Sequence, residues 1–294
     1  MRIGWIGTGI MGGPMAAHVQ QAEYELSVYN RTRDKARPLL DEGATWCDSP
    51  AAVGKTCDIV FTIVGFPADV EDVYLGKNGI LTGARDGACR IAVDMTTSNP
   101  SLAQRLADAG AERGVRVLDA PVSGGDVGAQ KGILAIMAGG DKQAFEEILP
   151  ILKLMGQNIR HMGSAGAGQH TKMCNQTLIA GTMIGVCESL LYASRAGLDQ
   201  KAVIEIIGKG AASSWSINNL GPRIAREDYG PGFFVDHFVK DMEIALAEAR
   251  RLNLALPGLA LVHQLYVALQ AQGGGRYGTQ GLMQVLENLS GDSS

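Results

Sequence analysis

A lysine and two amides at helical spacing form a distinctive polar cluster in this chain of 294 residues. Two glycines, Gly166 and Gly168, are followed by Lys172, Asn175 and Gln176. Residues three and four apart share a face of a helix, so these polar side chains are predicted to open one helix together. A lysine at the head of a largely buried helix is costly unless its charge is used, which makes Lys172 a candidate for chemistry. An exposed lysine in a first helical turn is the alternative.

A glycine-rich turn near the N-terminus predicts a dinucleotide site. Gly7, Gly9 and Gly12 have the spacing Gly-x-Gly-x-x-Gly, after the apolar run 2–6 and before a helical pattern. In this context the first glycine permits a tight turn, the second admits a pyrophosphate, and the third allows close packing of helix on strand. The start of the helix then offers N–H groups to the phosphates. A glycine-rich turn without a ligand is the alternative.

The residues after the second predicted strand bear on the choice of dinucleotide. NAD-dependent enzymes usually carry Asp or Glu there for the ribose 2′-hydroxyl, but residues 30–33 include no carboxylate. Arg31 and Thr32 can instead bind a 2′-phosphate through charge-assisted hydrogen bonds. The sequence therefore favours NADP, with NAD as the second option. Arginines that merely begin a solvated helix are the alternative.

The loop of residues 119–125 is a third candidate. Its proline and glycines end a strand pattern and expose backbone N–H groups beside the hydroxyl of Ser123. Such a loop can bind a carboxylate. An ordinary polar turn explains the same residues equally well.

Strand and helix patterns place these candidates in two regions. Up to residue 163, short apolar runs alternate with helical patterns, which predicts parallel β-α-β units with helices on both faces. After residue 163 only helical periodicity remains. We therefore predict an α/β fold with a Rossmann-type, doubly wound, mostly parallel dinucleotide-binding domain over residues 1–163. An all-helical domain for substrate binding and dimerisation is predicted over residues 164–294. The predicted strands are 2–6, 26–29, 59–64, 91–95, 115–118 and 133–138.

Composition excludes several classes of function. The net charge of −4 and the pI near 5.8 provide no basic surface for nucleic acid or an acidic membrane. The five scattered cysteines form no C-x-x-C pair or metal-ligand cluster, which predicts free thiols and no metal site. We expect no apolar run of the ~20 residues that span a bilayer, and no signal peptide at the N-terminus. These features predict a cytoplasmic protein.

Four motifs in order resemble the β-hydroxyacid dehydrogenase family, which includes 3-hydroxyisobutyrate dehydrogenases and semialdehyde reductases. They are residues 7–15 (GTGIMGGPM), 119–125 (DAPVSGG), 166–175 (GAGQHTKMCN) and 240–242 (KDM), and they span nearly the whole chain. The resemblance implies that Lys172 is the general acid/base and that Ser123, Gly124, Gly125 and Asn175 bind the substrate. Together with the motifs it predicts these cofactor-binding residues: Gly7, Gly9, Ile10, Met11, Gly12, Asn30, Arg31, Thr32, Val64, Thr97 and Lys240.

One departure from the family pattern affects the substrate. Hydroxyisobutyrate dehydrogenases usually carry two adjacent asparagines where this chain has Asn175 and Gln176, and the Asn-Gln pair is more similar to tartronate semialdehyde reductases. A longer amide would reshape the acyl pocket, so Gln176 is also predicted to bind the substrate.

The implied reaction is hydride transfer between nicotinamide and the carbinol carbon of a small, carboxylate-bearing hydroxy acid, with Lys172 moving the proton. Burial would lower the pKa of this lysine from its reference value of about 10.4. The alternatives are a tartronate, succinic semialdehyde or glyoxylate reductase that uses NADPH, an L-serine-type dehydrogenase, and a dinucleotide-binding module without turnover.

Two further features concern the second region. Apolar helical patterns at 257–272 and 278–289 exceed what a small domain covers, which predicts a homodimer or homotetramer. Trp215 lies among small polar residues and is either a pocket wall or a core residue.

Overall fold

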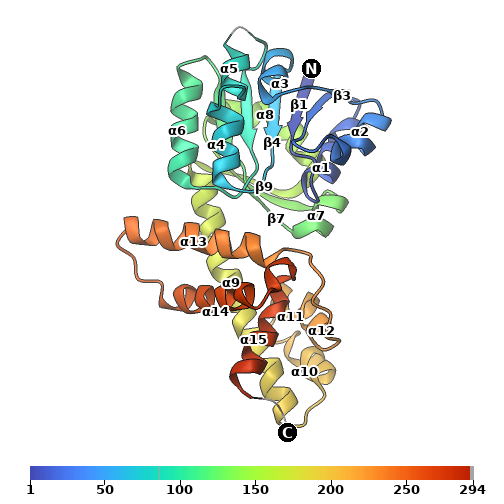
Figure 1. Ribbon diagram of the computed structural model, residues 1–294, viewed down its shortest axis with the longest axis vertical. Coiled ribbons are helices and arrows are strands. Elements are labelled where there is room, and N and C mark those ends of the chain that lie inside the picture. Colours follow the sequence, from blue (N-terminus) through green and yellow to red (C-terminus); the bar gives the residue numbers. More distant parts are fainter. Residues whose placement is uncertain (86, 292–294) are drawn as a thin grey trace. The chain divides into compact units, whose positions relative to one another are not determined.

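The computed structural model describes residues 1–85 and 87–291. They form two compact units, the first Met1–Lys172 and the second from Met173 onward. The first unit is built on a mostly parallel sheet and the second is helical (Figure 1). The division falls later than the predicted boundary at residue 163, because the first turns of the helix that begins at Ala167 are hydrogen-bonded within the first unit.

The sheet of the first unit has the strand order β3-β2-β1-β4-β5-β6-β8-β7, and β9 also pairs with β8. Neighbouring strands from β3 to β6 are parallel, whereas β8 is antiparallel to β6 and β7. The order reverses between β1 and β4, and the turn after β1 therefore lies at the switch point where α/β sheets bind ligands. The strands are β1 (Arg2–Ile6), β2 (Glu25–Tyr29), β3 (Thr45–Trp46), β4 (Ile59–Thr62), β5 (Ile91–Asp94), β6 (Arg116–Asp119), β7 (Val122–Ser123), β8 (Leu134–Gly139) and β9 (Gly156–Gly163).

Helices cover both faces of this sheet, as predicted (Figure 1). They are α1 (Gly12–Gln21), α2 (Arg37–Asp41), α3 (Pro50–Thr56), α4 (Pro67–Leu75), α5 (Ile80–Ala84), α6 (Pro100–Ala111), α7 (Gly125–Lys131) and α8 (Lys142–Met155), with a 3-10 turn η1 (Arg33–Ala36). Alternate strand residues feed two cores. Ile3 and Trp5 pack in one with α1 and α8, whereas Val60 packs in the other with α3, α4 and α6.

Several short elements lie outside the sequence prediction. The helices α3, α4 and α5 and the two-residue strands β3 and β7 are too short for a clear periodic pattern. Strand β9 is an edge strand whose side chains are mostly exposed or half-buried, so its sequence lacks the apolar run that marks buried strands.

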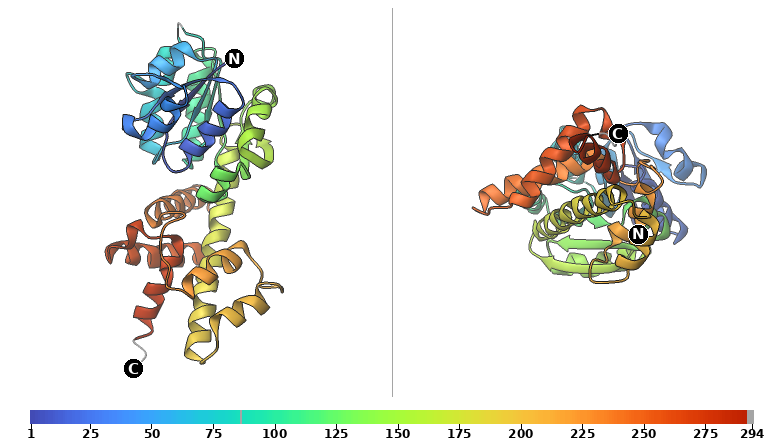
Figure 2. Two further views of the ribbon diagram at one scale, coloured as in Figure 1. Left: turned by 90° about the vertical axis from the view of Figure 1, so that its right-hand side faces the viewer. Right: turned by 90° about the horizontal axis from the view of Figure 1, so that it is seen from below.

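The second unit is organised around the long helix α9 (Ala167–Arg195), which begins in the first unit and continues into the second. Within the second unit, other helices pack around α9 (Figure 2). They are α10 (Gln200–Ile207), α11 (Trp215–Asn219), α12 (Gly221–Ile224), α13 (Val235–Arg251), α14 (Pro257–Ala271) and α15 (Leu282–Leu289), with 3-10 turns η2 (Gly274–Arg276) and η3 (Thr279–Gly281). Met183, Leu190, Phe238 and Tyr266 are fully buried in this core. The predicted helical character of this region is therefore confirmed.

The expectation that no segment is long and apolar enough to span a bilayer was wrong for α9. It has 29 residues, and an 18-residue window within it has a mean hydropathy of 1.3. Core helices of globular proteins meet the same criterion, and one side of α9 packs in the core of the second unit. Its buried polar side chains, Gln169, Lys172 and Gln176, are unusual for a lipid-facing segment.

Two expectations about individual side chains are settled by burial. Trp215 is 64% exposed, which excludes its reading as a core residue. All five cysteines are free, in agreement with the sequence, and Cys174 alone among them is exposed.

Candidate active site

The turn after β1 has the shape of a dinucleotide cradle. Gly7 has φ of +95°, and a Cβ atom on it would lie 2.0 Å from the carbonyl oxygen of Ile63. A Cβ atom on Gly12 would lie equally close to the carbonyl oxygen of Gly7, whereas one on Gly9 would meet no atom within 4 Å. Two glycines therefore close the turn, and the third leaves open space where a pyrophosphate can approach. Met11 is the N-cap residue of α1, and Ile10 is 57% exposed. The turn fits the pyrophosphate of a nicotinamide dinucleotide.

Asn30 joins this turn to the segment after β2. Its Oδ1 accepts a hydrogen bond of 3.0 Å from the backbone N–H of Thr8, and its Nδ2 donates one of 2.8 Å to the carbonyl of Thr32. Both ends of the amide are thus used to brace the loop that carries Arg31. Through these bonds Asn30 fixes the conformation of the candidate cofactor loop.

Among the residues that the structure describes, Arg31 is held by a single surface ion pair. Its Nη1 lies 3.3 Å from Oδ1 of Asp69, and its side chain is 87% exposed. Such pairs contribute about 0–1 kcal/mol, so Arg31 can exchange this partner for a phosphate at little cost. Arg33 stacks over the ring of Trp46, 5.1 Å from its centroid, which places a second cation beside this loop.

A buried network fixes the ends of β4 and β5. Oδ1 of Asp94 accepts hydrogen bonds from the hydroxyl of Thr62 and the backbone N–H of Thr96, at 3.1 and 3.0 Å. The hydroxyl of Thr96 in turn accepts one from the backbone N–H of Val64 at 2.9 Å. Burial raises the pKa of Asp94 to about 7, although the hydrogen bonds from Thr96 and Thr62 oppose the shift. The network holds the turn that carries Thr97, and it brings Val64 to the same end of the sheet.

Lys172 is buried in the structure, with 6% of its surface exposed. Its Nζ donates a hydrogen bond of 2.7 Å to the carbonyl of Val122, the residue that precedes Ser123. The exposed-lysine reading is therefore wrong. The start of α9 is held by Asp119, whose two carboxylate oxygens accept hydrogen bonds of 2.8 Å from the N–H groups of Gly166 and Gln169. Burial raises the pKa of Asp119, and these backbone bonds oppose that shift.

The loop after Ser123 needs its two glycines. Gly124 has φ of +137° and Gly125 has φ of +62°, conformations that side chains other than hydrogen rarely allow. Half-buried Ser123 ends the short strand β7, and α7 starts immediately after it at Gly125. Ser123 and the two glycines follow Val122 directly in the sequence, and the carbonyl of Val122 accepts the hydrogen bond from Lys172. The first unit thus contains the first two motifs and residues 166–172 of the third.

The remaining candidates form a hydrogen-bonded chain inside the second unit. Nδ2 of Asn175 donates to Oε1 of Gln176 at 2.7 Å, and Nε2 of Gln176 donates to Oδ2 of Asp241. Nζ of Lys240 lies 3.0 Å from the other oxygen of Asp241. Gln176 is only 1% exposed and uses both ends of its amide within this chain. Burial and the charge of Lys240 lower the pKa of the neighbouring His237.

Sequence reasoning assigned no role to Asp94, Thr96, Asp119 or Gln169, which support the site in the structure. Asp119 and Gln169 lie inside the quoted motifs, and that position was the available signal. In the described ranges 1–85 and 87–291, no group of three or more His, Cys, Asp or Glu side chains could hold a metal ion.

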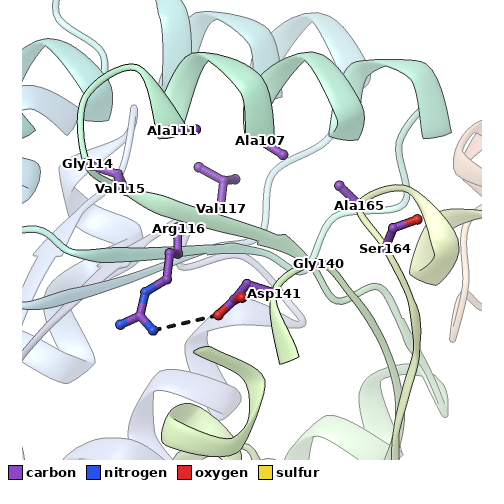
Figure 3. A pocket seen from close by; sticks show the side chains of 10 residues that line it. All are labelled: Ala107, Ala111, Gly114, Val115, Arg116, Val117, Gly140, Asp141, Ser164 and Ala165. Atoms are coloured by element: carbon purple, nitrogen blue, oxygen red, sulfur yellow. Dashed lines mark ion pairs between the residues drawn. The ribbon is translucent and has the colours of Figure 1, made fainter. Parts of the chain in front are cut away.

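A hollow of about 510 Å³ lies elsewhere in the first unit. It is lined by α6 residues including Ala107, by the start of β6, and by the segments near Gly140 and Ser164. Arg116 and Asp141 form an ion pair at its margin (Figure 3). Its lining includes none of the predicted site residues. The predicted site residues Gly7, Thr97 and Ser123 lie instead at or just after the ends of β1, β5 and β7.

Comparisons with known proteins agree with this arrangement. Residues 2–163 match the family described as the NAD binding domain of 6-phosphogluconate dehydrogenase. Residues 166–286 match the family described as NAD-binding of NADP-dependent 3-hydroxyisobutyrate dehydrogenase. A probable 3-hydroxyisobutyrate dehydrogenase-like protein of Arabidopsis thaliana is 51% identical over 98% of this chain and 86% of its own length. The 2-hydroxy-3-oxopropionate reductase of Escherichia coli is 38% identical over 99% of this chain and 98% of its own.

A solved structure shares the whole fold. The 3-hydroxyisobutyrate dehydrogenase of Mycobacterium tuberculosis, solved with L-serine, superposes with a TM-score of 0.86 at 27% identity, and the match covers 97% of this chain and 99% of that one. The fold, the glycine cradle and these matches define a nicotinamide-dinucleotide-dependent oxidoreductase. Within that class, the chain belongs to the β-hydroxyacid dehydrogenase family.

Proposed function

We propose that this protein interconverts a small β-hydroxy acid and its semialdehyde, with NADP as the preferred cofactor and Lys172 as the general acid/base. The class of reaction, hydride transfer between NAD(P) and the CH–OH group of a hydroxy acid, follows from its family membership. The observation that carries the residue assignment is the hydrogen bond of 2.7 Å from Nζ of Lys172 to the carbonyl of Val122, beside Ser123.

The residues divide the chemistry between them. The nicotinamide, when bound, supplies or accepts the hydride. The hydroxyl of Ser123 and the backbone of Gly124 and Gly125 bind the substrate carboxylate and so orient the carbinol carbon. Lys172 donates a proton to the carbonyl oxygen during reduction and accepts the hydroxyl proton during oxidation. The carbonyl of Val122 restricts the rotamers of the lysine, which keeps its Nζ beside the carboxylate loop.

The preference for NADP is supported by the loop after β2. Arg31 is exposed and forms a surface ion pair with Asp69 across 3.3 Å, and Thr32 is exposed beside it. A guanidinium and a hydroxyl together suit a 2′-phosphate, and Asn30 is already committed to backbone bonds. NAD, which lacks this phosphate, gains nothing from Arg31.

The substrate is proposed from the relatives and from the amide pair. Relatives named for 3-hydroxyisobutyrate and for 2-hydroxy-3-oxopropionate both point to short 3-hydroxy acids. Asn175 and Gln176 favour the 2-hydroxy-3-oxopropionate (tartronate semialdehyde) branch on residue type. Reduction of succinic semialdehyde or glyoxylate is the second candidate. Oxidation of L-serine is a third, supported by the ligand of the Mycobacterium tuberculosis structure.

A substrate panel tests this proposal. Purified protein is mixed with NADPH and the semialdehydes of methylmalonate, tartronate and succinate, or with glyoxylate, and in the reverse direction with NADP and 3-hydroxyisobutyrate, glycerate or L-serine. We expect the largest kcat/KM with a three- or four-carbon 3-oxo acid. Tight binding of NADPH without turnover of any compound would instead identify a dinucleotide-binding module.

We also propose that the protein is a cytoplasmic homodimer or homotetramer. One face of α9 in the second unit is exposed and partly apolar, with Leu178 at 73% and Tyr192 at 75% exposure. Between them, a Cβ atom placed on Gly181 or on Gly185 would meet no atom within 4 Å. A second copy of the chain can cover this face closely because the two glycines leave room for a helix.

A further inference from the structure

Gln169 is a fully buried glutamine in the first turn of α9, with no exposed surface. Its side chain makes two hydrogen bonds to the turn after β5. Nε2 donates to the carbonyl of Thr96 at 2.7 Å, and Oε1 accepts from the backbone N–H of Ser98 at 2.9 Å. The carboxamide therefore spans Thr97 from both sides. The Gln169 side chain thus fixes the backbone around Thr97 through the backbone groups of the two neighbouring residues.

The backbone of Gln169 is held as well. Its N–H donates to Oδ2 of Asp119 at 2.8 Å, beside the bond from Gly166 to the other carboxylate oxygen. Asp119 is the last residue of β6, which lies next to β5. Gln169 is therefore hydrogen-bonded to the ends of two neighbouring strands. One turn further along α9, Lys172 shares the face of Gln169 and reaches the carbonyl of Val122.

These contacts join two parts of the candidate site. The family resemblance implies that Thr97 lines the nicotinamide pocket, and α9 carries Lys172, the proposed proton donor and acceptor. A buried carboxamide is expensive to desolvate unless its donor and acceptor are both satisfied, and here both are satisfied by the backbone on the two sides of one residue. Packing of α9 against the sheet alone would need only an apolar side chain at this position.

We propose that Gln169 is a positioning residue that fixes the separation between the nicotinamide pocket at Thr97 and the ammonium group of Lys172. This inference rests on the proposed function, in which hydride transfer and proton transfer occur on the same carbinol group. Both transfers need their donors placed together, and an error of about 1 Å costs on the order of 100-fold in rate.

The first test is kinetic and uses Gln169→Met, which keeps the length of the side chain and removes both hydrogen bonds. The matched control is Gln20→Met, because Gln20 also donates from Nε2 to two backbone carbonyls, those of Leu39 and Glu42, in the same unit but away from the site. We expect kcat to fall by about 10- to 100-fold in Gln169→Met only. The deuterium isotope effect on kcat with 4-deuterated NADPH should rise, because hydride transfer becomes rate-limiting. A wild-type isotope effect and kcat in Gln169→Met would overturn the proposal, as would an equal loss in Gln20→Met.

The second test needs no turnover and so separates this inference from the proposed function. Binding of NADPH and of 2′-phospho-ADP-ribose, which lacks the nicotinamide, is compared by calorimetry. Gln169→Met should bind NADPH several-fold more weakly and 2′-phospho-ADP-ribose like the wild type. Hydrogen exchange at residues 96–98 should be faster in this variant. If wild-type protein turns over nothing in the substrate panel, the proposed function fails while this comparison still applies. Equal binding losses for both ligands, or unchanged exchange, would overturn the positioning role.

Discussion

At the scale of single residues, the site depends on charges that are buried with specific partners. Lys172 is buried against the carbonyl of Val122, and Asp94 is buried against Thr62 and Thr96. Arg31 is the opposite case, since it is exposed and weakly paired. Buried groups of this kind determine reactivity and pH dependence, whereas the exposed arginine is the residue proposed to select between NADP and NAD.

Replacement of Lys172 should abolish turnover and leave cofactor binding close to that of wild type. Lys172→Ala removes the group that is proposed to move the proton, and a loss of about 10²- to 10⁴-fold in kcat is expected. Lys172→Arg should also fail, because a guanidinium does not release its proton. Steady-state kinetics and NADPH fluorescence titration measure the two effects. Exposed Lys153→Ala serves as the control, and retained activity in Lys172→Ala would refute the assignment.

The protonation of Asp94 should make stability depend on pH. Because its folded pKa is raised to about 7, the folded state binds this proton more tightly than the unfolded state. Its contribution is complete below the ordinary carboxyl pKa of about 4 and is lost as pH rises through about 7, a change on the order of 4 kcal/mol. In Asp94→Asn, the free energy of unfolding, measured in urea, should fall less between about pH 4 and pH 7 than it does in the wild type. Asp108→Asn, on the exposed side of α6, should retain the wild-type decline. Parallel curves for wild type and Asp94→Asn would contradict the prediction.

Removal of the Arg31 side chain should reduce selectivity for NADP. Loss of charge-assisted hydrogen bonds worth about 1.5–3 kcal/mol predicts roughly 10- to 100-fold weaker NADPH binding in Arg31→Ala. NADH binding should not change. The control is Arg37→Ala. Arg37 is an exposed arginine of α2 that pairs with Asp41 of the same helix. A wild-type protein that prefers NAD in steady-state kinetics would exclude the proposed preference.

At the scale of elements, the position of α9 determines the position of its lysine. The helix starts where Asp119 accepts two backbone N–H groups, and Gln169 ties the same turn to the end of β5. The first turn of α9 is thus anchored at the carboxyl ends of β5 and β6, and this anchoring sets the position of Lys172 on the helix.

Asp119→Ala should therefore reduce both stability and rate. It leaves two buried N–H groups without acceptors, at a cost of about 1–3 kcal/mol each. Asp141 is a suitable control, because its carboxylate caps α8 through the N–H of Ala144. Asp141→Ala should lose about 1 kcal/mol and keep its kcat. Chemical denaturation and steady-state kinetics test both variants. If Asp119→Ala lowers stability but leaves kcat unchanged, the hydrogen bonds of Asp119 to the start of α9 do not position Lys172.

At the scale of the whole molecule, the chain is two units that share one helix. The glycine cradle, the loop of Ser123 and Lys172 belong to the first unit, and the amide chain from Asn175 to Lys240 belongs to the second. The exposed face of α9 in the second unit is the proposed surface for self-association.

Light scattering should give a dimeric or tetrameric mass for the wild-type chain. Leu178→Glu places a charge on the exposed face of α9 and should shift the protein toward the monomer, since a buried unpaired charge opposes association. Leu75→Glu, at a partly exposed leucine of the first unit, should keep the wild-type mass. A monomeric wild type would contradict the proposed oligomer.

The sequence by itself determined the features that depend on neighbouring residues. Glycine spacing predicted the cradle after β1, short apolar runs predicted the central strands, and helical spacing placed Lys172, Asn175 and Gln176 on one helix. Only the tertiary structure decided which groups these residues meet. Lys172 and its acceptor are 50 positions apart, and Gln169 lies 71 and 73 positions from its partners Ser98 and Thr96. Local periodicity carries no information on such pairs, because they form only when strand ends distant in sequence come together in the sheet.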